Sequence, residues 1–138
     1  MKLISYNIRG MGGKDKKVDI RNLISHNSPE FVCIQETKLE KIDRTICSFL
    51  WGSDKFDFEF KESDGRSGGL LVLWDLKSFK LISSVCLKHA QIINKIWLKD
   101  NVHVVFVNVC ASCDLRNKVE CWNEILGDLN AYKDGTIF

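Results

Sequence analysis

The sequence predicts a mixed α/β protein whose sheet contains antiparallel strands, and two observations predict it. Strand-like apolar runs alternate with segments of helical periodicity in the first half, and a series of strand-like runs then precedes a final helix. Residues 70–74 (LLVLW) form a continuous apolar run, which is typical of a strand buried on both faces. With 138 residues, 45% of them hydrophobic and 28% charged, the chain is expected to form one globular domain, residues 1–138.

The first half is expected to alternate strands with helices. Apolar residues recur every three or four positions in both helical segments, and Pro29 ends the first of them. The expected elements are a strand at 2–8, a glycine-rich loop at 9–15, a helix at 18–27, a strand at 30–35 and a helix at 38–51.

The second half is expected to be mostly strands. Residues 56–60 (FDFEF) alternate strictly, and Lys99, Asp100 and Asn101 form a credible hairpin turn. The helix at 117–132 has an apolar stripe of Val119, Trp122, Ile125, Leu126 and Leu129. The expected strands are 56–60, 70–74, 79–87, 92–98 and 102–109, with a loop at 62–69 and a turn entering a further strand at 134–138.

Charge and cysteine content limit the classes of function. The net charge is only +2, so a local basic cluster such as 14–17 (KDKK) can serve nucleic-acid binding or simply form a solvated loop and helix start. No signal peptide or transmembrane-length apolar run is visible, so we expect an intracellular protein, nuclear or cytoplasmic, without a membrane partner. Its six cysteines are then expected to be thiols. Cys110 and Cys113 form one C-x-x-C pair, and zinc would need two more ligands.

Two polar residues follow predicted strands and indicate a site. Asn7 ends the first strand, and Glu36 ends the apolar run of the second. If these strands are parallel neighbours, both side chains lie in the crevice at the strand ends, where α/β sheets bind ligands. An amide oxygen beside a carboxylate suits Mg²⁺, which takes few protein ligands and keeps waters. The alternative is that Asn7 caps a turn and Glu36 caps the next helix.

Five stretches, in this order, resemble the endonuclease/exonuclease/phosphatase superfamily, and in particular the endonuclease domain of plant LINE-type (non-LTR) retrotransposons. They are SYNIRG (5–10), QETK (35–38), GRSGGLLVLWD (65–75), VVFVNVCAS (104–112) and LRNKVECWNEI (115–125). QET alone would be a weak signal, whereas the ordered set is specific and spans nearly the whole chain.

The resemblance implies a four-layer α/β sandwich of two sheets that hydrolyses DNA phosphodiesters with Mg²⁺, or with Mn²⁺ in its place. It assigns Glu36 as the metal ligand, Asn7 as its neighbour that aligns a metal water or phosphate oxygen, and Asn108 as a further polar group near the site. Three cations are candidate phosphate contacts with solvated surface as the alternative for each: Arg9, Lys38 and Arg66.

Departures from the family pattern predict impaired activity. Cys110 stands where the family has an active-site tyrosine, and Ser112 replaces a proline. The family also needs an Asp-x-Asn at a strand end and a late Asp-His pair. Residues 127–130 (GDLN) imitate the first motif but continue the helical stripe, so we expect them to be helical. His26, His89 and His103 are expected to be structural or surface residues.

The missing motifs indicate that the C-terminal portion of the sandwich is absent. We expect the chain to supply one sheet and an edge of the second, leaving apolar surface exposed on strands 70–74 and 102–109. Self-association through that surface is then expected, with DNA as the partner of the complete domain. The alternatives to an impaired nuclease are a relic that binds nucleic acid or protein, and a thiol or zinc module at Cys110 and Cys113.

Overall fold

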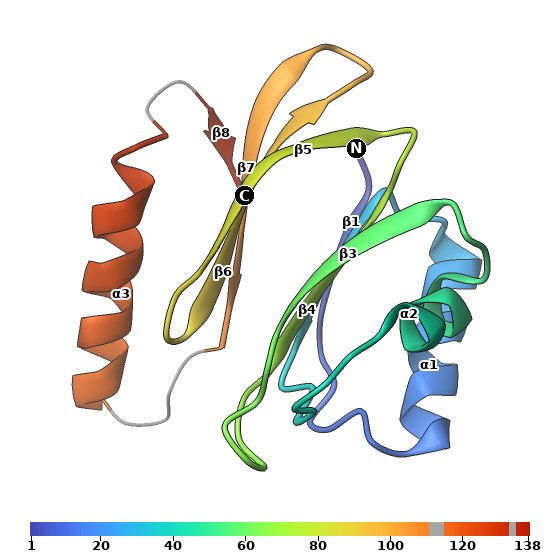
Figure 1. The fold of residues 1–138 in the computed structure, drawn as a ribbon. Helices are drawn as coiled ribbons and strands as arrows, with labels where there is room; N and C mark the ends of the chain where they lie inside the picture. The colour runs from blue at the N-terminus through green and yellow to red at the C-terminus, as the bar shows by residue number, and fades with distance from the viewer. Residues whose placement is uncertain (111–114, 133–134) are drawn as a thin grey trace.

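Two four-stranded sheets lie face to face in the structure, a computed structural model that describes residues 1–110, 115–132 and 135–138. Two helices cover the outer face of the first sheet, and a third helix covers the outer face of the second (Figure 1). The layers are therefore helix, sheet, sheet, helix, as predicted for a four-layer sandwich. The expectation of one sheet and an edge of the second is wrong, because the described ranges contain four strands in each sheet.

The first sheet combines one parallel and two antiparallel pairings. β1 and β2 run parallel and are connected through α1, whereas β4 is antiparallel to both β2 and β3. The parallel pair places the carboxyl ends of β1 and β2 at the same edge of the sheet. In sheet order the strands are β1 (Leu3–Asn7), β2 (Phe31–Gln35), β4 (Leu70–Asp75) and β3 (Phe56–Lys61), and the helices are α1 (Lys14–Asn27) and α2 (Arg44–Trp51).

The second sheet is an antiparallel meander extended by one short parallel strand. β5, β6 and β7 pair antiparallel, and β8 pairs parallel with β7 through Val104↔Thr136 and Val105↔Ile137. Every predicted strand is present, with ends displaced by at most two residues. The elements are β5 (Phe79–Cys86), β6 (Ala90–Trp97), β7 (Val102–Val109), α3 (Leu115–Leu129) and β8 (Thr136–Ile137).

An aromatic core joins the two sheets. The ring of Phe31 on β2 stacks on that of Phe106 on β7 with centroids 3.8 Å apart, and Phe79 meets both rings edge-on. Residues 70–74 of β4 are at most 1% exposed, and residues 104–106 of β7 are at most 2% exposed. The expectation that these two strands present apolar surface is therefore wrong, because each sheet covers the inner face of the other.

α1 and α2 begin at other residues than predicted, and α3 exposes part of its predicted apolar stripe. α1 begins at Lys14, so the basic cluster 14–17 is its first turn. The prediction of a helix at 38–51 is wrong over 38–43, because Asp43 is the N-cap of α2 and accepts a hydrogen bond from the Ile46 N–H (2.9 Å). None of the helices in the described ranges is long and apolar enough to cross a membrane.

α3 buries only part of its predicted stripe. Cys121 and Ile125 are 2% exposed and face the second sheet, and Leu129 packs beside them. The remaining three stripe residues are more than half exposed: Val119, Trp122 and Leu126. The prediction for residues 127–130 is confirmed in that Gly127 and Asp128 lie inside the helix, which ends at Leu129.

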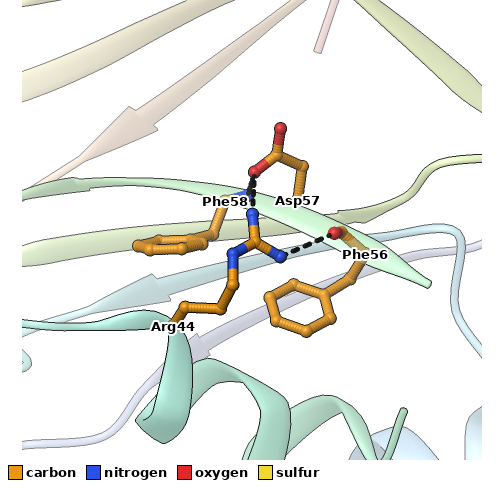
Figure 2. A network of polar contacts seen from close by, with 4 residues as sticks. All are labelled: Arg44, Phe56, Asp57 and Phe58. Carbon is orange, nitrogen blue, oxygen red and sulfur yellow. Dashed lines mark hydrogen bonds and ion pairs between the residues drawn. The ribbon is translucent and has the colours of Figure 1, made fainter. Parts of the chain in front are cut away.

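Arg44 fastens the start of α2 to β3 (Figure 2). Its guanidinium donates to the Asp57 carboxylate (2.9 Å) and to the Phe56 carbonyl (3.4 Å), and it lies over the rings of Phe56 and Phe58 at 5.0 and 5.5 Å. A planar cation meets two aromatic faces and a carboxylate at once. These contacts hold α2 against the outer strand of the first sheet.

Candidate metal and phosphate site

Asn7 and Glu36 lie on the rim of one pocket. β1 and β2 pair so that Asn7 stands opposite Gln35, which places Glu36 one residue beyond the paired strand end. Both residues line a pocket of about 490 Å³ between the first sheet and β7. Cys110, which directly follows β7 of the second sheet, lines the same pocket. The parallel register thus brings an amide and a carboxylate together at one strand-end crevice.

Backbone hydrogen bonds continue beyond the ends of β1 and β2 and hold the segments that follow these two strands. Gly10 N–H donates to the Glu36 carbonyl (2.7 Å), and Lys38 N–H donates to the Gly68 carbonyl (2.8 Å). Glu36 has φ 56° and Lys38 has φ 55°, a left-handed conformation that few non-glycine residues adopt. Backbone strain of this kind persists where the surroundings enforce it, and it is concentrated at functional sites.

Gly69 makes this arrangement possible. Its φ is +89°, and a Cβ there would lie 2.2 Å from Thr37 Oγ1 and 3.2 Å from the Lys38 nitrogen. Thr37 is fully buried, and its N–H donates to the Gly69 carbonyl (3.1 Å). The glycine pair before β4 therefore lets the 36–38 segment lie directly on the start of β4.

The two interpretations of Asn7 and Glu36 have different outcomes. Asn7 does cap a turn, since its Oδ1 accepts from the Arg9 N–H (3.1 Å). That oxygen has a second lone pair, so the turn leaves one acceptor position. Glu36 does not cap the following helix, because α2 begins at Arg44 and its N-cap is Asp43. The carboxylate of Glu36 thus has no role in starting a helix.

Asn108 lies behind the pocket rather than on its surface. It is 1% exposed, and its amide donates to the carbonyls of Ile34 and Leu71 (3.2 and 3.3 Å) and to Gln91 (3.3 Å). Its Oδ1 accepts from Gln35 Nε2 (2.7 Å). Asn108 therefore ties β7 to β2 and β4 of the first sheet. Gln35 also donates to Ser5 on β1 (3.1 Å), a link that the sequence did not suggest.

A second pocket, of about 640 Å³, shares Glu36 and Cys110 with the first. Lys38 and Arg66 line it, as two of the predicted phosphate contacts, whereas Arg9 lines neither pocket. Two further cations line it that sequence reasoning missed, Lys61 at the end of β3 and Lys88 between β5 and β6. Four cations face three carboxylates on this wall, which are those of Glu36, Glu62 and Asp64.

Cys110 stands where the two pockets meet. A Cβ on Gly68 would lie 3.9 Å from its sulfur, so the thiol lies beside the glycine turn, and Cys110 lines both pockets with Glu36. Burial, and secondarily the charge of Glu36, raise the pKa of the Cys110 thiol above its usual value. Cys113 and Ser112 lie outside the described residues. Within the described ranges no three His, Cys, Asp or Glu residues are grouped to hold a metal.

The three histidines have different positions. His26 Nδ1 contacts the Asn22 carbonyl in α1 (2.6 Å), and His103 Nε2 contacts Asn94 Oδ1 on the neighbouring strand. Both fit the expected structural role. His89 is half-buried and lines the second pocket, so it is the histidine nearest to the candidate site. Its carbonyl accepts from Cys110 N–H (2.9 Å), which places it across from the thiol.

The fold is a four-layer α/β sandwich with polar side chains gathered at the strand ends of its first sheet. The sequence matches the Endonuclease/Exonuclease/phosphatase family over residues 4–136, and the chain belongs to that family. No curated protein matches the sequence.

Solved structures share the fold at low sequence identity. The AP endonuclease of Leishmania major superposes with a TM-score of 0.69 at 16% identity, over 93% of this chain and 47% of that one. A mannosyl-6-phosphatase of Bacteroides thetaiotaomicron gives 0.73 at 11% identity, over 99% and 62%. The human Nocturnin catalytic domain gives 0.70 at 13% identity, over 96% and 60%. The chain thus spans about half to three fifths of the length of these structures.

Proposed function

We propose that Glu36, with Asn7 beside it, binds Mg²⁺ or Mn²⁺, and that the function of the complete domain is hydrolysis of DNA phosphodiesters, as in LINE-type retrotransposon endonucleases. The observation that carries the proposal is the placement of these two side chains on one pocket rim, next to a second pocket with four cations. The family membership and the ordered sequence motifs support the same chemistry.

The donor set fits a hard cation that keeps most of its water. A carboxylate and an amide oxygen are both oxygen ligands, and Mg²⁺ is commonly held by one or two protein groups. When bound, such a cation lowers the pKa of a coordinated water and stabilises negative charge on a phosphate. Glu36 would hold the cation, and the amide of Asn7 would orient a water or a phosphate oxygen beside it. The tightly hydrogen-bonded 36–38 segment keeps the carboxylate in place without further ligands.

The second pocket suits the phosphate chain of a nucleic acid. Lys38, Lys61, Arg66 and Lys88 come from three parts of the chain and line one pocket together with Glu36. Cations that contact phosphates fix the position of a nucleic acid without reading its sequence. The acidic residues on the same wall keep the net charge small, so binding is expected to be weak and strongly dependent on salt.

A second candidate function is nucleic-acid binding without hydrolysis. The described residues contain no Asp-x-Asn at a strand end, because Asp128 lies within α3 and lines neither pocket. Among the described residues, no hydrogen bond joins an aspartate to a histidine on the walls of these pockets. A chain that holds metal and phosphate but cannot orient the attacking water would bind DNA and cleave it poorly.

Two measurements separate these functions. Cleavage of supercoiled plasmid in Mg²⁺ is compared for the wild type, Glu36→Gln and Glu40→Gln, an exposed acid away from both pockets. Loss of cleavage in Glu36→Gln alone supports the nuclease, whereas equal cleavage in all three proteins shows that this site is not responsible.

Fluorescence anisotropy with labelled DNA then tests binding. Arg66→Ala and Lys88→Ala are each expected to lower the affinity and the salt slope. Binding with no cleavage supports the second function. Absence of binding and of cleavage in the wild type rejects both functions.

A further inference from the structure

α3 carries apolar side chains on two sides, and only one of these sides is covered. Cys121 and Ile125 are 2% exposed and pack on the second sheet. Val119, Trp122 and Leu126 are 53%, 51% and 59% exposed, and α3 lies at the outside of the molecule (Figure 1). Their spacing of three and four residues sets them in one stripe along the helix. The three large side chains therefore form a patch, in contrast to apolar residues exposed singly.

A hole surrounded by neutral residues adjoins this stripe. Residues at i, i+3, i+4 and i+7 of a helix surround one depression, into which a side chain of a neighbouring helix can insert. At the carboxyl end of α3 these positions are exposed and uncharged: Asn123, Leu126, Gly127 and Asn130. Outside its own helix, no atom of the described residues lies within 4 Å of where a Cβ on Gly127 would stand. A glycine inside a helix lowers helix stability, so Gly127 opens a depression that the packing of the chain itself does not use.

The charges of α3 are arranged against the dipole of the helix. Arg116 and Lys118 lie in the first turn of the described helix, which contains no acidic residue, and Asp128 lies in the last turn, which contains no basic residue. The amino end of a helix favours anions, and its carboxyl end favours cations. Arg116 pairs with Glu120 (4.0 Å), whereas Lys118 is exposed. An antiparallel helix of the same sequence places each basic first turn beside a carboxyl end, so two copies of α3 are complementary in charge.

We propose that α3 is a self-association surface on which a second copy of this chain docks, with the two helices antiparallel. Trp122 of each copy inserts into the hole at residues 123–130 of the other, and two-fold symmetry forms this contact twice. A standard interface buries about 800 Å² on each partner, and three half-exposed side chains provide only part of that area. The dimer is therefore weak, with a Kd of about 10–100 µM. Val119, Trp122 and Leu126 line neither pocket of the candidate site, so the proposal is independent of the metal site.

Sedimentation velocity over about 2–200 µM protein tests the proposal. The average mass of the wild type is expected to rise with concentration from that of a monomer towards that of a dimer. Trp122→Ser is expected to raise the Kd by about tenfold or more, whereas Leu98→Ser, at a 45% exposed apolar residue after β6, leaves the Kd unchanged. A wild type that stays monomeric over the whole range overturns the proposal, and so does equal association of the wild type and Trp122→Ser.

Gly127→Ala separates docking from helix stability, because its two effects have opposite directions. Alanine favours the helix, so Tm at about 2 µM, where the chain is monomeric, is expected to rise by about 2–4 °C. The added methyl group fills part of the hole, so the Kd is expected to rise by about 3–10-fold. A Gly127→Ala protein with the higher Tm and an unchanged Kd overturns the proposal.

Lys118→Glu tests the orientation of the two helices. The change removes a cation that lies beside the carboxyl end of the partner helix, so the Kd is expected to rise by about threefold at low salt and by less at high salt. Tighter association of Lys118→Glu overturns the antiparallel arrangement.

Discussion

Replacing Lys95 by methionine is expected to stabilise the protein at neutral pH. Lys95 on β6 is 0% exposed between the sheets, and its Nζ lies 3.0 Å from the centroid of the Trp74 ring. This Nζ has no hydrogen-bond partner among the described residues. Burial lowers the pKa of Lys95 from 10.5 to about 7, against the opposing charges of Asp57 and Glu59. Lys95 thus has a charge that the folded state disfavours.

The size of the effect follows from the pKa shift. The pKa is lower in the folded state, so the unfolded chain binds more protons between pH 7 and 10.5, and stability rises with pH across that window. At about 1.4 kcal/mol per pKa unit, the buried amine destabilises the fold by roughly 4 kcal/mol at pH 7, and roughly 1.5 kcal/mol of this is relieved by pH 8.5. Methionine has a similar length and removes the charge, while the lost cation–π contact offsets part of the gain. We expect a net increase of about 2–3 kcal/mol at pH 7.

Urea unfolding at pH 7.0 and pH 8.5 measures this difference. Lys80→Met, on the exposed side of the neighbouring strand β5, makes the same change of charge without the burial. Burial raises the pKa values of Cys33 and Cys47 to about 12, from about 9 in the unfolded chain. These thiols therefore lower the free energy of unfolding only as the pH rises past about 9, and they do so equally in all variants. A Lys95→Met protein that is less stable than the wild type at pH 7, or that keeps the wild-type pH dependence, would refute this account of Lys95.

Three further predictions concern the folded framework. Gly69→Ala is expected to lower the free energy of unfolding by about 2–4 kcal/mol, because of the positive φ and the steric clash, whereas Gly12→Ala, with open space around it, should change it by less than about 1 kcal/mol in urea titrations. Arg44→Met is expected to cost about 1 kcal/mol, because its ion pair is largely exposed, and raising the salt concentration should shrink the difference from wild type. Trp122→Ser should reduce self-association in size-exclusion chromatography without lowering Tm, while Ile125→Ser, on the buried side of α3, should lower Tm.

Strands were predictable because their signal is local, whereas the start of α2 was predicted too early. Leu39 and Ile42 have the helical spacing that extended the predicted helix to residue 38, and both are in fact part of the core. They reach it from a non-helical segment, so an apolar residue at helical spacing reports burial and not backbone conformation. The start signal was present in Asp43, whose carboxylate caps α2.

Some residues of the candidate site could be predicted from local sequence, whereas others join it only through the tertiary fold. Asn7 and Glu36 were predictable because the end of an apolar run is visible in the sequence and parallel pairing brings such ends together. Of the four cations that line the second pocket, Lys38 and Arg66 were predicted, whereas Lys88 was not, because it joins them only after the β5–β6 turn has been placed in space.

α3 shows why periodicity alone could not settle which surface is covered. Apolar residues occupy a wide arc of this helix, and spacing treats the side of Ile125 and the side of Trp122 as one stripe. The second sheet is only as wide as its strands, so it buries Ile125 and Cys121 and leaves Trp122 in solvent. Which side of α3 is covered therefore depends on packing between distant segments and not on the helix's own sequence.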